Sequence, residues 1–499
     1  MNDNNIEQKT KVYKSMSKNK MIKNSAWYLG GTIISAILGL INTPLLTRVL
    51  EPKVYAQYGM LISFTTVLAT FIYLGQDEAF MRFFSRRKDS YKCFFWRCIR
   101  IPLLLCSIIM ILLLEPSHTL LNWVFESDLP LLSCVMVGLY IFVLVVQRFL
   151  LLTARMEERA ANFVFSNVAT KGGFIIAILL FYYYISKSLS FDTIVICLLF
   201  GVIVALAINL FVIIKISHGN NSQGENISSK EMLIYGLPFA FSTTLSFGVP
   251  LIEKLIIREQ TNWETLAIYT AAAIFITVMN LVKTTVNSVW IPYAYKNYQN
   301  EERFKTVFYN VGICLTSFCM LIVAGTILTR RWLVFMFDSK YYDAMLIAPA
   351  IVCGACFDLL SGIYAIGINI SQKTKYHIIV PVAHLIVSAV LLFGLLPVIG
   401  LRATGLAYIV SIAISRYIQI HIAFKQYDTG KDNKPLLIFL CVGVIISILS
   451  LFITSLTFDI ICAFFLVGAT VVFSRKEVVA LYKWYRNDRL VEANSNESV

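Results

Sequence analysis

Charged residues are scarce in this chain of 499 residues. Asp, Glu, Lys and Arg together make up 14% of the sequence, hydrophobic residues make up 58%, and the mean hydropathy is +0.72. Ordinary soluble domains carry about 25% charged residues. The composition therefore excludes a soluble globular protein and predicts an all-α polytopic membrane protein, because a bilayer supplies the apolar environment that the side chains require.

The sequence also lacks the motifs of common enzyme classes. It contains no G-x-x-x-x-G-K-[ST] phosphate loop, no H-E-x-x-H zinc motif and no G-x-S-x-G nucleophile motif. An Asp-x-Asp pair, which holds a metal ion against a nucleotide-sugar diphosphate, is missing as well. The five histidines are scattered, and Cys353 and Cys356 form a CxxC pair without a second one. We therefore predict a protein that is not an enzyme, with no metal and no cofactor.

About fourteen apolar stretches are candidates for membrane-spanning helices of roughly 20 residues each. The predicted spans are 26–50, 56–80, 98–115, 129–152, 162–184, 191–216, 232–257, 265–290, 306–329, 344–370, 377–398, 401–424, 436–455 and 457–474. An even number of spans places both termini on one side of the membrane. Most of the 43 Lys and Arg residues fall in the segments that this register places on the N-terminal side, which predicts that both termini are cytoplasmic.

A polar segment near the middle of the chain separates two groups of spans. A proline, a cation four residues later and an Ala-x-Tyr recur in both groups, which predicts two six-helix bundles related by a pseudo-two-fold axis along the membrane normal. The recurring residues are Pro44, Arg48 and Ala56-x-Tyr58 in the first group, and Pro250, Lys254 and Ala267-x-Tyr269 in the second. The predicted domains are a basic cytoplasmic segment 1–25, a six-helix bundle 26–216, a cytoplasmic linker 217–231, a second six-helix bundle 232–424, two additional helices 425–474 and a cytoplasmic tail 475–499.

Two acidic residues lie within predicted spans. Asp358 is near the middle of span 344–370, where a carboxylate has to face a cavity, meet a partner or be protonated. Glu253 lies in span 232–257, directly before Lys254. A structural hydrogen bond is the alternative for Asp358. We predict that Asp358 has a functional role, and Glu253 is a second acidic candidate.

Three cations from different spans lie at a similar predicted depth. Lys171, Lys283 and Arg416 are each about 10–14 Å from the cytoplasmic end of their helix, at 1.5 Å per residue. Together with Lys254 they predict a cationic cavity that binds an anionic substrate such as a lipid-linked phosphate or diphosphate. The alternative for each cation alone is a side chain that snorkels to the interface.

Further charged residues lie near the cytoplasmic ends of spans. Arg148 is one turn from the end of its span, which favours snorkelling to the interface. Asp77 and Glu78 could pair with Arg82 by helical spacing, because Arg82 is a few residues further along the same helix.

Several short motifs occur in a characteristic order along the predicted topology. They are Asn24-Ser25-Ala26-Trp27, Pro44-Leu45-Leu46-Thr47-Arg48, Tyr55-Ala56-Gln57-Tyr58-Gly59, Arg155-Met156-Glu157-Glu158-Arg159-Ala160, Tyr235-Gly236-Leu237-Pro238, Ala267-Ile268-Tyr269, Trp290-Ile291-Pro292, Tyr341-Tyr342-x-Ala344, Lys373-Thr374-Lys375 and Gly400-Leu401-Arg402-Ala403-Thr404-Gly405-Leu406-Ala407. In their order and position, these motifs resemble the polysaccharide (oligosaccharide) flippases of the Wzx type, which belong to the multidrug/oligosaccharidyl-lipid/polysaccharide exporter superfamily. The similarity extends from about residue 21 to 474.

The resemblance implies two six-helix bundles with two extra C-terminal helices, and alternating access through a cationic cavity. It also implies possible coupling to a proton or sodium gradient, for which Asp358 and Glu253 are the candidates in this chain. It implies a flippase that moves an undecaprenyl-diphosphate-linked oligosaccharide from the inner to the outer leaflet of a bacterial plasma membrane, for capsule, O-antigen or teichoic acid. Membrane lipids, a polysaccharide polymerase and glycosyltransferases are the implied partners, and no nucleic acid is expected. Relatives often carry an Asp-Arg pair where this chain has Glu253 and Lys254.

Two other functions stay open at this point. One is a small-molecule or drug-cation antiporter of the same fold, which Asp358 suits as a proton site but the excess of intramembrane cations does not. The other is an integral-membrane polysaccharide polymerase, which requires a sizeable outer loop that the predicted topology does not provide. A lipid II flippase is the nearest relative in function, and fold-level analogy does not separate it from the first hypothesis.

Overall fold

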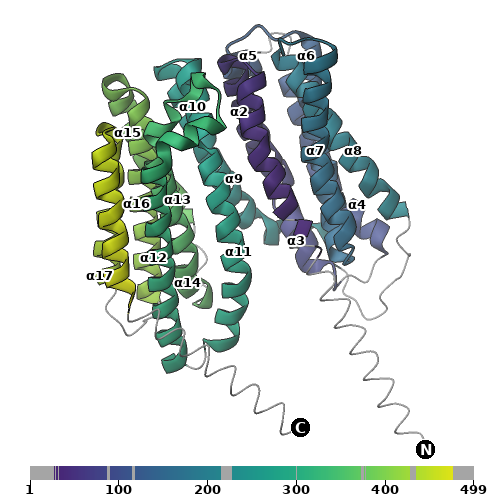
Figure 1. Cartoon of the computed structure of the whole chain (residues 1–499). Helices are drawn as coiled ribbons and strands as arrows, with labels where there is room; N and C mark the ends of the chain where they lie inside the picture. Colours follow the sequence, from purple (N-terminus) through teal and green to yellow (C-terminus); the bar gives the residue numbers. More distant parts are fainter. Residues whose placement is uncertain are drawn as a thin grey trace, which may run out of the picture. The chain divides into compact units, whose positions relative to one another are not determined.

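The computed structural model describes residues 27, 30–31, 33–86, 90–114, 119–214, 227–298, 301–371, 376, 378–426 and 434–475. Over these residues the chain is helical and contains no strand, which confirms the predicted all-α fold class (Figure 1). The basic segment 1–25, the tail 476–499 and most of the predicted linker 217–231 lie outside the described residues.

The predicted number of about fourteen apolar helices is confirmed among the described residues. Twelve helices are long and apolar enough to cross a membrane, and two shorter apolar helices, Ile33–Val49 and Leu440–Phe452, accompany them. The chain is therefore a multi-pass membrane protein.

The chain divides into two compact units, Met1–Leu251 and Ile252–Val499, which we call unit 1 and unit 2. The division falls within one continuous helix, α9, so the predicted domain bounds at 216 and 232 stay a prediction. The helices up to this point are Ile33–Val49, α2 (Pro52–Tyr73), α3 (Gln76–Phe83), α4 (Tyr91–Leu113), α5 (Thr119–Phe125), α6 (Leu131–Met156), α7 (Ala160–Tyr184), α8 (Phe191–Ile214) and α9 (Ser229–Gln260).

Unit 1 has an aromatic core where α3, α4 and α6 meet. The ring of Phe80 on α3 packs against Phe94 on α4 and Phe149 on α6, with centroid distances of 5.4 and 6.2 Å. All three side chains are fully buried. Aromatic burial of this extent holds the short helix α3 in one orientation, and this orientation turns its first residues toward α6.

The break between α2 and α3 forms a close backbone contact with α9. Gly75 has a φ of +69°, a left-handed conformation that glycine adopts without strain. A Cβ atom added to Gly75 would lie 2.0 Å from the carbonyl oxygen of Gly236, and one added to Gly236 would lie 2.5 Å from that of Gly75. A side chain at either position would block this approach, so both residues have to be glycine. The contact brings α9 against the end of α2.

Unit 2 continues with further helices and two 3₁₀ turns. Their bounds are α10 (Trp263–Ala272), α11 (Ile274–Asn297), α12 (Glu301–Leu333), η1 (Val334–Met336), η2 (Ser339–Tyr341), α13 (Ala344–Tyr364), α14 (Ile366–Ile370), α15 (Ile379–Ile399), α16 (Leu401–Gln426), α17 (Lys434–Phe452) and a last apolar helix, Leu456–Arg475.

Helix α13 is the central helix of unit 2. It contacts α10, α11, α12, α16 and α17, and 83% of its most apolar stretch is buried (Figure 1). Its sequence is apolar on every face, as expected for a helix surrounded by others. Small residues allow the close packing: a Cβ atom added to Gly354 would lie 2.8 Å from the ring of Tyr408 on α16. This central position carries Asp358 into the interior of the unit.

Candidate functional site

Asp358 on α13 lies between two cations from neighbouring helices. Its Oδ2 is 2.5 Å from Nζ of Lys283 on α11, and its Oδ1 is 2.5 Å from Nη2 of Arg416 on α16. The side chains of Asp358, Lys283 and Arg416 are 16, 28 and 23% exposed, respectively. We call Lys283, Asp358 and Arg416 the charge cluster. Its formal charges sum to +1, because one carboxylate faces two cations.

The charge cluster retains hydrogen-bonding capacity. Nη1 of Arg416 donates to Oε1 of Gln419 at 3.1 Å, whereas its Nε is buried and has no hydrogen-bond partner in the described part of the chain. A lysine ammonium has three N–H donors, and the contact with Asp358 occupies one. The cluster is therefore suited to bind an anion while remaining partly charge-compensated in its absence.

The two other cations predicted for the cavity are on different helices, α7 and α9. Lys171 on α7 belongs to unit 1, where its Nζ donates to the backbone carbonyl of Ser35 at 2.8 Å. Lys254 on α9 belongs to unit 2 and is buried. The structure thus brings together Lys283, Arg416 and Asp358, and a shared cavity with Lys171 or Lys254 stays a prediction.

Glu253 on α9 is buried among hydrogen-bond donors. Its carboxylate accepts from the hydroxyl of Tyr269 at 3.0 Å and from Oγ of Ser388 at 2.5 Å, and Nε2 of His384 is 3.3 Å away. Sequence reasoning set His384 aside as one of several scattered histidines. The sequence did contain one indication of its role: His384 and Ser388 are four residues apart, so they lie on the same face of their helix.

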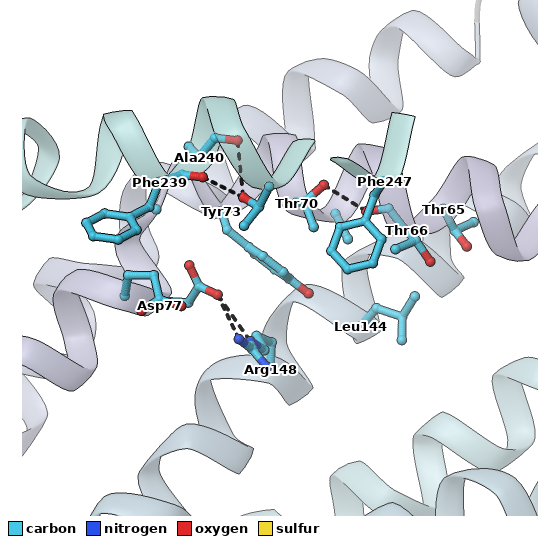
Figure 2. Close-up of a pocket in the computed structure, with 14 residues that line it drawn as sticks. Thr65, Thr66, Thr70, Tyr73, Asp77, Leu144, Arg148, Phe239, Ala240 and Phe247 are labelled. Atoms are coloured by element: carbon cyan, nitrogen blue, oxygen red, sulfur yellow. Dashed lines mark hydrogen bonds and ion pairs between the residues drawn. The ribbon is translucent and has the colours of Figure 1, made fainter. Parts of the chain in front are cut away.

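Unit 1 contains a second polar site that the sequence did not reveal. Nη2 and Nε of Arg148 on α6 donate to Oδ2 of Asp77 on α3, at 2.9 and 3.3 Å (Figure 2). The expectations that Arg148 snorkels and that Asp77 pairs with Arg82 on its own helix were both wrong. The break at Gly75 starts a new helix at Gln76, and the aromatic core of unit 1 holds this helix with Asp77 directed at α6.

The Arg148–Asp77 pair lies in a cavity of about 300 Å³ within unit 1 (Figure 2). We call it the unit 1 pocket. Helices α2, α3, α6 and α9 supply its walls. Its lining residues are Thr65, Thr66, Ala69, Thr70, Tyr73, Gly75, Asp77, Glu78, Leu144, Arg148, Phe239, Ala240, Thr243 and Phe247.

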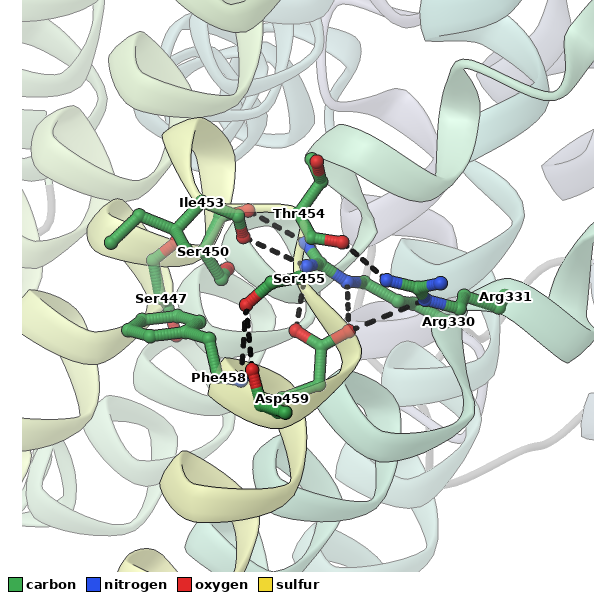
Figure 3. Close-up of polar contacts among 10 residues, drawn as sticks. Arg330, Arg331, Ser447, Ser450, Ile453, Thr454, Ser455, Phe458 and Asp459 are labelled. Carbon is green, nitrogen blue, oxygen red and sulfur yellow. Dashed lines mark hydrogen bonds and ion pairs between the residues drawn. The ribbon is translucent and has the colours of Figure 1, made fainter.

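A third Arg–Asp pair joins α12 to the last helix. Nη2 and Nε of Arg330 donate to the two carboxylate oxygens of Asp459, at 2.6 and 3.0 Å (Figure 3). Arg330 also donates to the backbone carbonyls of Ser450 and Ile453, at 2.6 and 2.9 Å. Both charged side chains are 2% exposed or less. Sequence reasoning did not single out this pair, whose members are 129 residues apart.

The fold is that of known lipid and drug transporters. A structure titled lipid II flippase MurJ in an inward closed conformation has a TM-score of 0.68 and 14% identity, and the match covers 90% of this chain and 99% of the other. An inward-facing multidrug resistance MATE family transporter of the MOP superfamily has a TM-score of 0.62 and 14% identity, with 80% and 95% covered. A MOP superfamily transporter from Pyrococcus furiosus, titled as having a binding pocket of reverse polarity, has a TM-score of 0.51 and 14% identity, with 83% and 97% covered.

No curated protein sequence matches the chain. A family model does, over residues 21–298, which is more than half of the 499 residues. The description of this family is polysaccharide biosynthesis protein. The match agrees with the resemblance found in the short motifs. With the all-helical transporter fold and the apolar spans, it identifies the chain as a multi-pass membrane protein of the polysaccharide biosynthesis protein family.

Proposed function

We propose that this protein is a flippase that moves an undecaprenyl-diphosphate-linked oligosaccharide from the inner to the outer leaflet of a bacterial plasma membrane by alternating access. The observation that carries the proposal is the charge cluster, in which two cations share one carboxylate inside a bundle of membrane helices. Charged groups at membrane depth are costly, and those with remaining binding capacity are candidates for substrate or ion pathways. Family membership and fold support a transporter that serves polysaccharide synthesis.

The charge cluster is suited to bind the diphosphate of this substrate. It is a strongly hydrated anion, so it requires replacement donors on leaving water. Lys283 offers a compact ammonium, and Arg416 offers a guanidinium that binds two phosphate oxygens at once. In the absence of substrate, Asp358 compensates part of the charge of both cations. A bound diphosphate competes with this carboxylate for the same donors.

This competition provides a route to ion coupling. Once the diphosphate occupies Lys283 and Arg416, the carboxylate of Asp358 is released to bind a proton or a sodium ion. Glu253 is the second candidate for coupling, although three donor groups already surround it. Lys171 and Lys254 complete the proposed cationic cavity at other stages of the cycle.

The proposal includes the cellular setting. Both termini face the cytoplasm, where the lipid-linked oligosaccharide is made by glycosyltransferases, and a polymerase takes up the product on the outer side. The protein acts without a cofactor and does not itself make or break glycosidic bonds. A drug-cation antiporter of the same fold is the principal alternative, since a MATE transporter also shares the architecture.

The test is lipid flipping by the purified full-length protein. Liposomes would contain a fluorescent undecaprenyl-diphosphate oligosaccharide, and an impermeant quencher would report its exposure, with and without a proton or sodium gradient. We expect protein-dependent exposure that is abolished in the double variant Lys283→Gln/Arg416→Gln. Lys340→Gln is the matched control, because Lys340 is an exposed cation outside the charge cluster, and it should leave flipping unchanged.

Two results would contradict the proposal. One is exposure equal to that of empty liposomes while a cationic dye accumulates against a gradient, which would favour the antiporter. The other is normal flipping by a double Gln variant that is present at wild-type amount in the liposomes, which would remove the charge cluster from the substrate path.

A further inference from the structure

The unit 1 pocket differs in chemistry from the charge cluster. Four threonines line it, Thr65, Thr66 and Thr70 on α2 and Thr243 on α9 (Figure 2). Each hydroxyl donates to a carbonyl of its own helix, at 2.6 to 3.0 Å. The proton is therefore used within the helix, and the lone pairs of the oxygen are what the threonine offers to a ligand.

The acidic residues of the pocket add further acceptors. Both contacts of Arg148 reach Oδ2 of Asp77, and no hydrogen bond or ion pair to Oδ1 occurs within the described residues. Glu78 lines the same cavity and is partly exposed. One arginine and two carboxylates give the lining a formal charge of −1. A phosphate, which offers acceptors and negative charge, is repelled by this lining, whereas a group rich in hydroxyl donors fits it.

Aromatic side chains complete one side of the pocket. Phe239 and Phe247, both on α9, present their rings to the cavity (Figure 2). They are 43 and 47% exposed, so their apolar surface is available to a ligand. The guanidinium of Arg148 lies over the ring of Tyr73, and its Cζ atom is 6.0 Å from the ring centroid. A cavity of about 300 Å³ is at the small end of ligand sites, which suits one ring of an oligosaccharide rather than a whole chain.

We propose that the unit 1 pocket binds a neutral sugar ring of the transported lipid-linked oligosaccharide. The hydroxyls of the sugar donate to the threonine oxygens and to Asp77, the guanidinium of Arg148 donates to a sugar oxygen, and the apolar face of the ring lies against phenylalanine. This inference rests on the proposed function. It assigns the glycan to a pocket whose formal charge is opposite in sign to that of the charge cluster, which is proposed to bind the diphosphate.

The experiment measures binding of two lipids to the purified full-length protein in detergent. The probes are undecaprenyl diphosphate without sugar and undecaprenyl diphosphate bearing a single neutral hexose. We expect the hexose to increase the affinity of the wild type about tenfold, as a few neutral hydrogen bonds do. Replacing hexose hydroxyls by fluorine keeps their size and removes the donated proton, and this should abolish the increase.

Two variants locate the effect. Thr243→Val should lower the affinity for the hexose-bearing lipid about two- to tenfold, the loss of one neutral hydrogen bond, and leave the bare lipid unaffected. Thr70→Val repeats the test on α2. Ser246→Ala is the matched control, because its hydroxyl also donates to its own helix, to Ser242 at 2.8 Å, but does not line the pocket. It should change neither affinity.

The outcomes separate this inference from the proposed function. Binding of neither lipid would reject the proposed function. Equal binding of both lipids, or equal loss of both in Thr243→Val and Thr70→Val, would reject the sugar site alone. Retention of the tenfold increase by the fluorinated hexose would also reject it, because the pocket would then not select hydroxyl donors. Tight binding of sodium ions to the wild type, lost in the same variants without any effect of the sugar, would assign the pocket to a cation instead.

Discussion

Two Arg–Asp pairs in unit 2 use the same functional groups in opposite ways. In the pair of Arg330 and Asp459, both carboxylate oxygens accept from one guanidinium, two backbone carbonyls accept from the same guanidinium, and Arg331 lies 3.7 Å from the carboxylate. Both side chains are 2% exposed or less. In the charge cluster, one carboxylate faces two cations, Arg416 Nε has no hydrogen-bond partner within the described residues, and the side chains are 16 to 28% exposed.

The difference shows what distinguishes a structural pair from a candidate binding site. A buried pair is tolerated when its geometry is good and other groups satisfy the remaining donors, as in the Arg330 pair. Such a pair has no capacity for a ligand. The charge cluster has an arginine nitrogen without a hydrogen-bond partner in the described residues, and its side chains are partly exposed, so it has capacity for an incoming anion. Saturation and burial therefore separate the two roles, although both pairs lie in apolar spans.

The largest expected effect is on the saturated pair. Arg330→Gln removes the close cation of the buried carboxylate of Asp459 and leaves only the 3.7 Å contact with Arg331, so we expect it to lower the free energy of unfolding by about 3–5 kcal/mol. Denaturation of the detergent-solubilised protein would measure this. Arg331→Gln is the control: its side chain is 43% exposed and 3.7 Å from Asp459, so the expected change is below about 1 kcal/mol. Equal losses in the two variants would show that burial does not govern the cost here.

A smaller effect is expected from a ligand of the charge cluster. Inorganic pyrophosphate should stabilise the wild type against unfolding, by about 2.7 kcal/mol at one hundred times its dissociation constant. The effect should disappear in Lys283→Gln/Arg416→Gln and remain in Arg331→Gln. It should also weaken as salt is added, because the cluster is partly exposed. Undiminished stabilisation in the double variant would place the pyrophosphate elsewhere.

The smallest expected change in stability is that of Asp358→Asn, and the same substitution at Asp459 is its comparison. Asp459→Asn should cost about 3–5 kcal/mol, since it leaves a buried guanidinium unpaired. Asp358→Asn should cost no more than about 1 kcal/mol, because its partners are partly exposed. Its consequence should instead appear in transport, as a loss of the response of flipping to a proton or sodium gradient. If Asp358→Asn proved as destabilising as Asp459→Asn, the charge cluster would be a structural pair as well.

The sequence anticipated part of the candidate site. Asp358, Lys283 and Arg416 were selected because they lie deep in apolar spans, and depth follows from the rise of a helix alone. Their pairing was not predicted, since Lys283 and Asp358 are 75 residues apart and helix periodicity says nothing about neighbours at that distance. Arg148 shows the reverse error: its place near a helix end favoured snorkelling, while a glycine break 73 residues earlier had turned Asp77 toward it.

The sequence by itself determined the class of this protein. Long apolar stretches with few charges have to become membrane helices, because unpaired backbone groups are too costly in lipid, and the short motifs placed these helices in a family. Only the tertiary structure decided which charges meet. Whether Asp358 faces two cations, whether Arg330 is saturated, and whether four threonines line one pocket depend on the rotation of each helix against its neighbours. That rotation is set by packing between residues far apart in the chain, which no local pattern records.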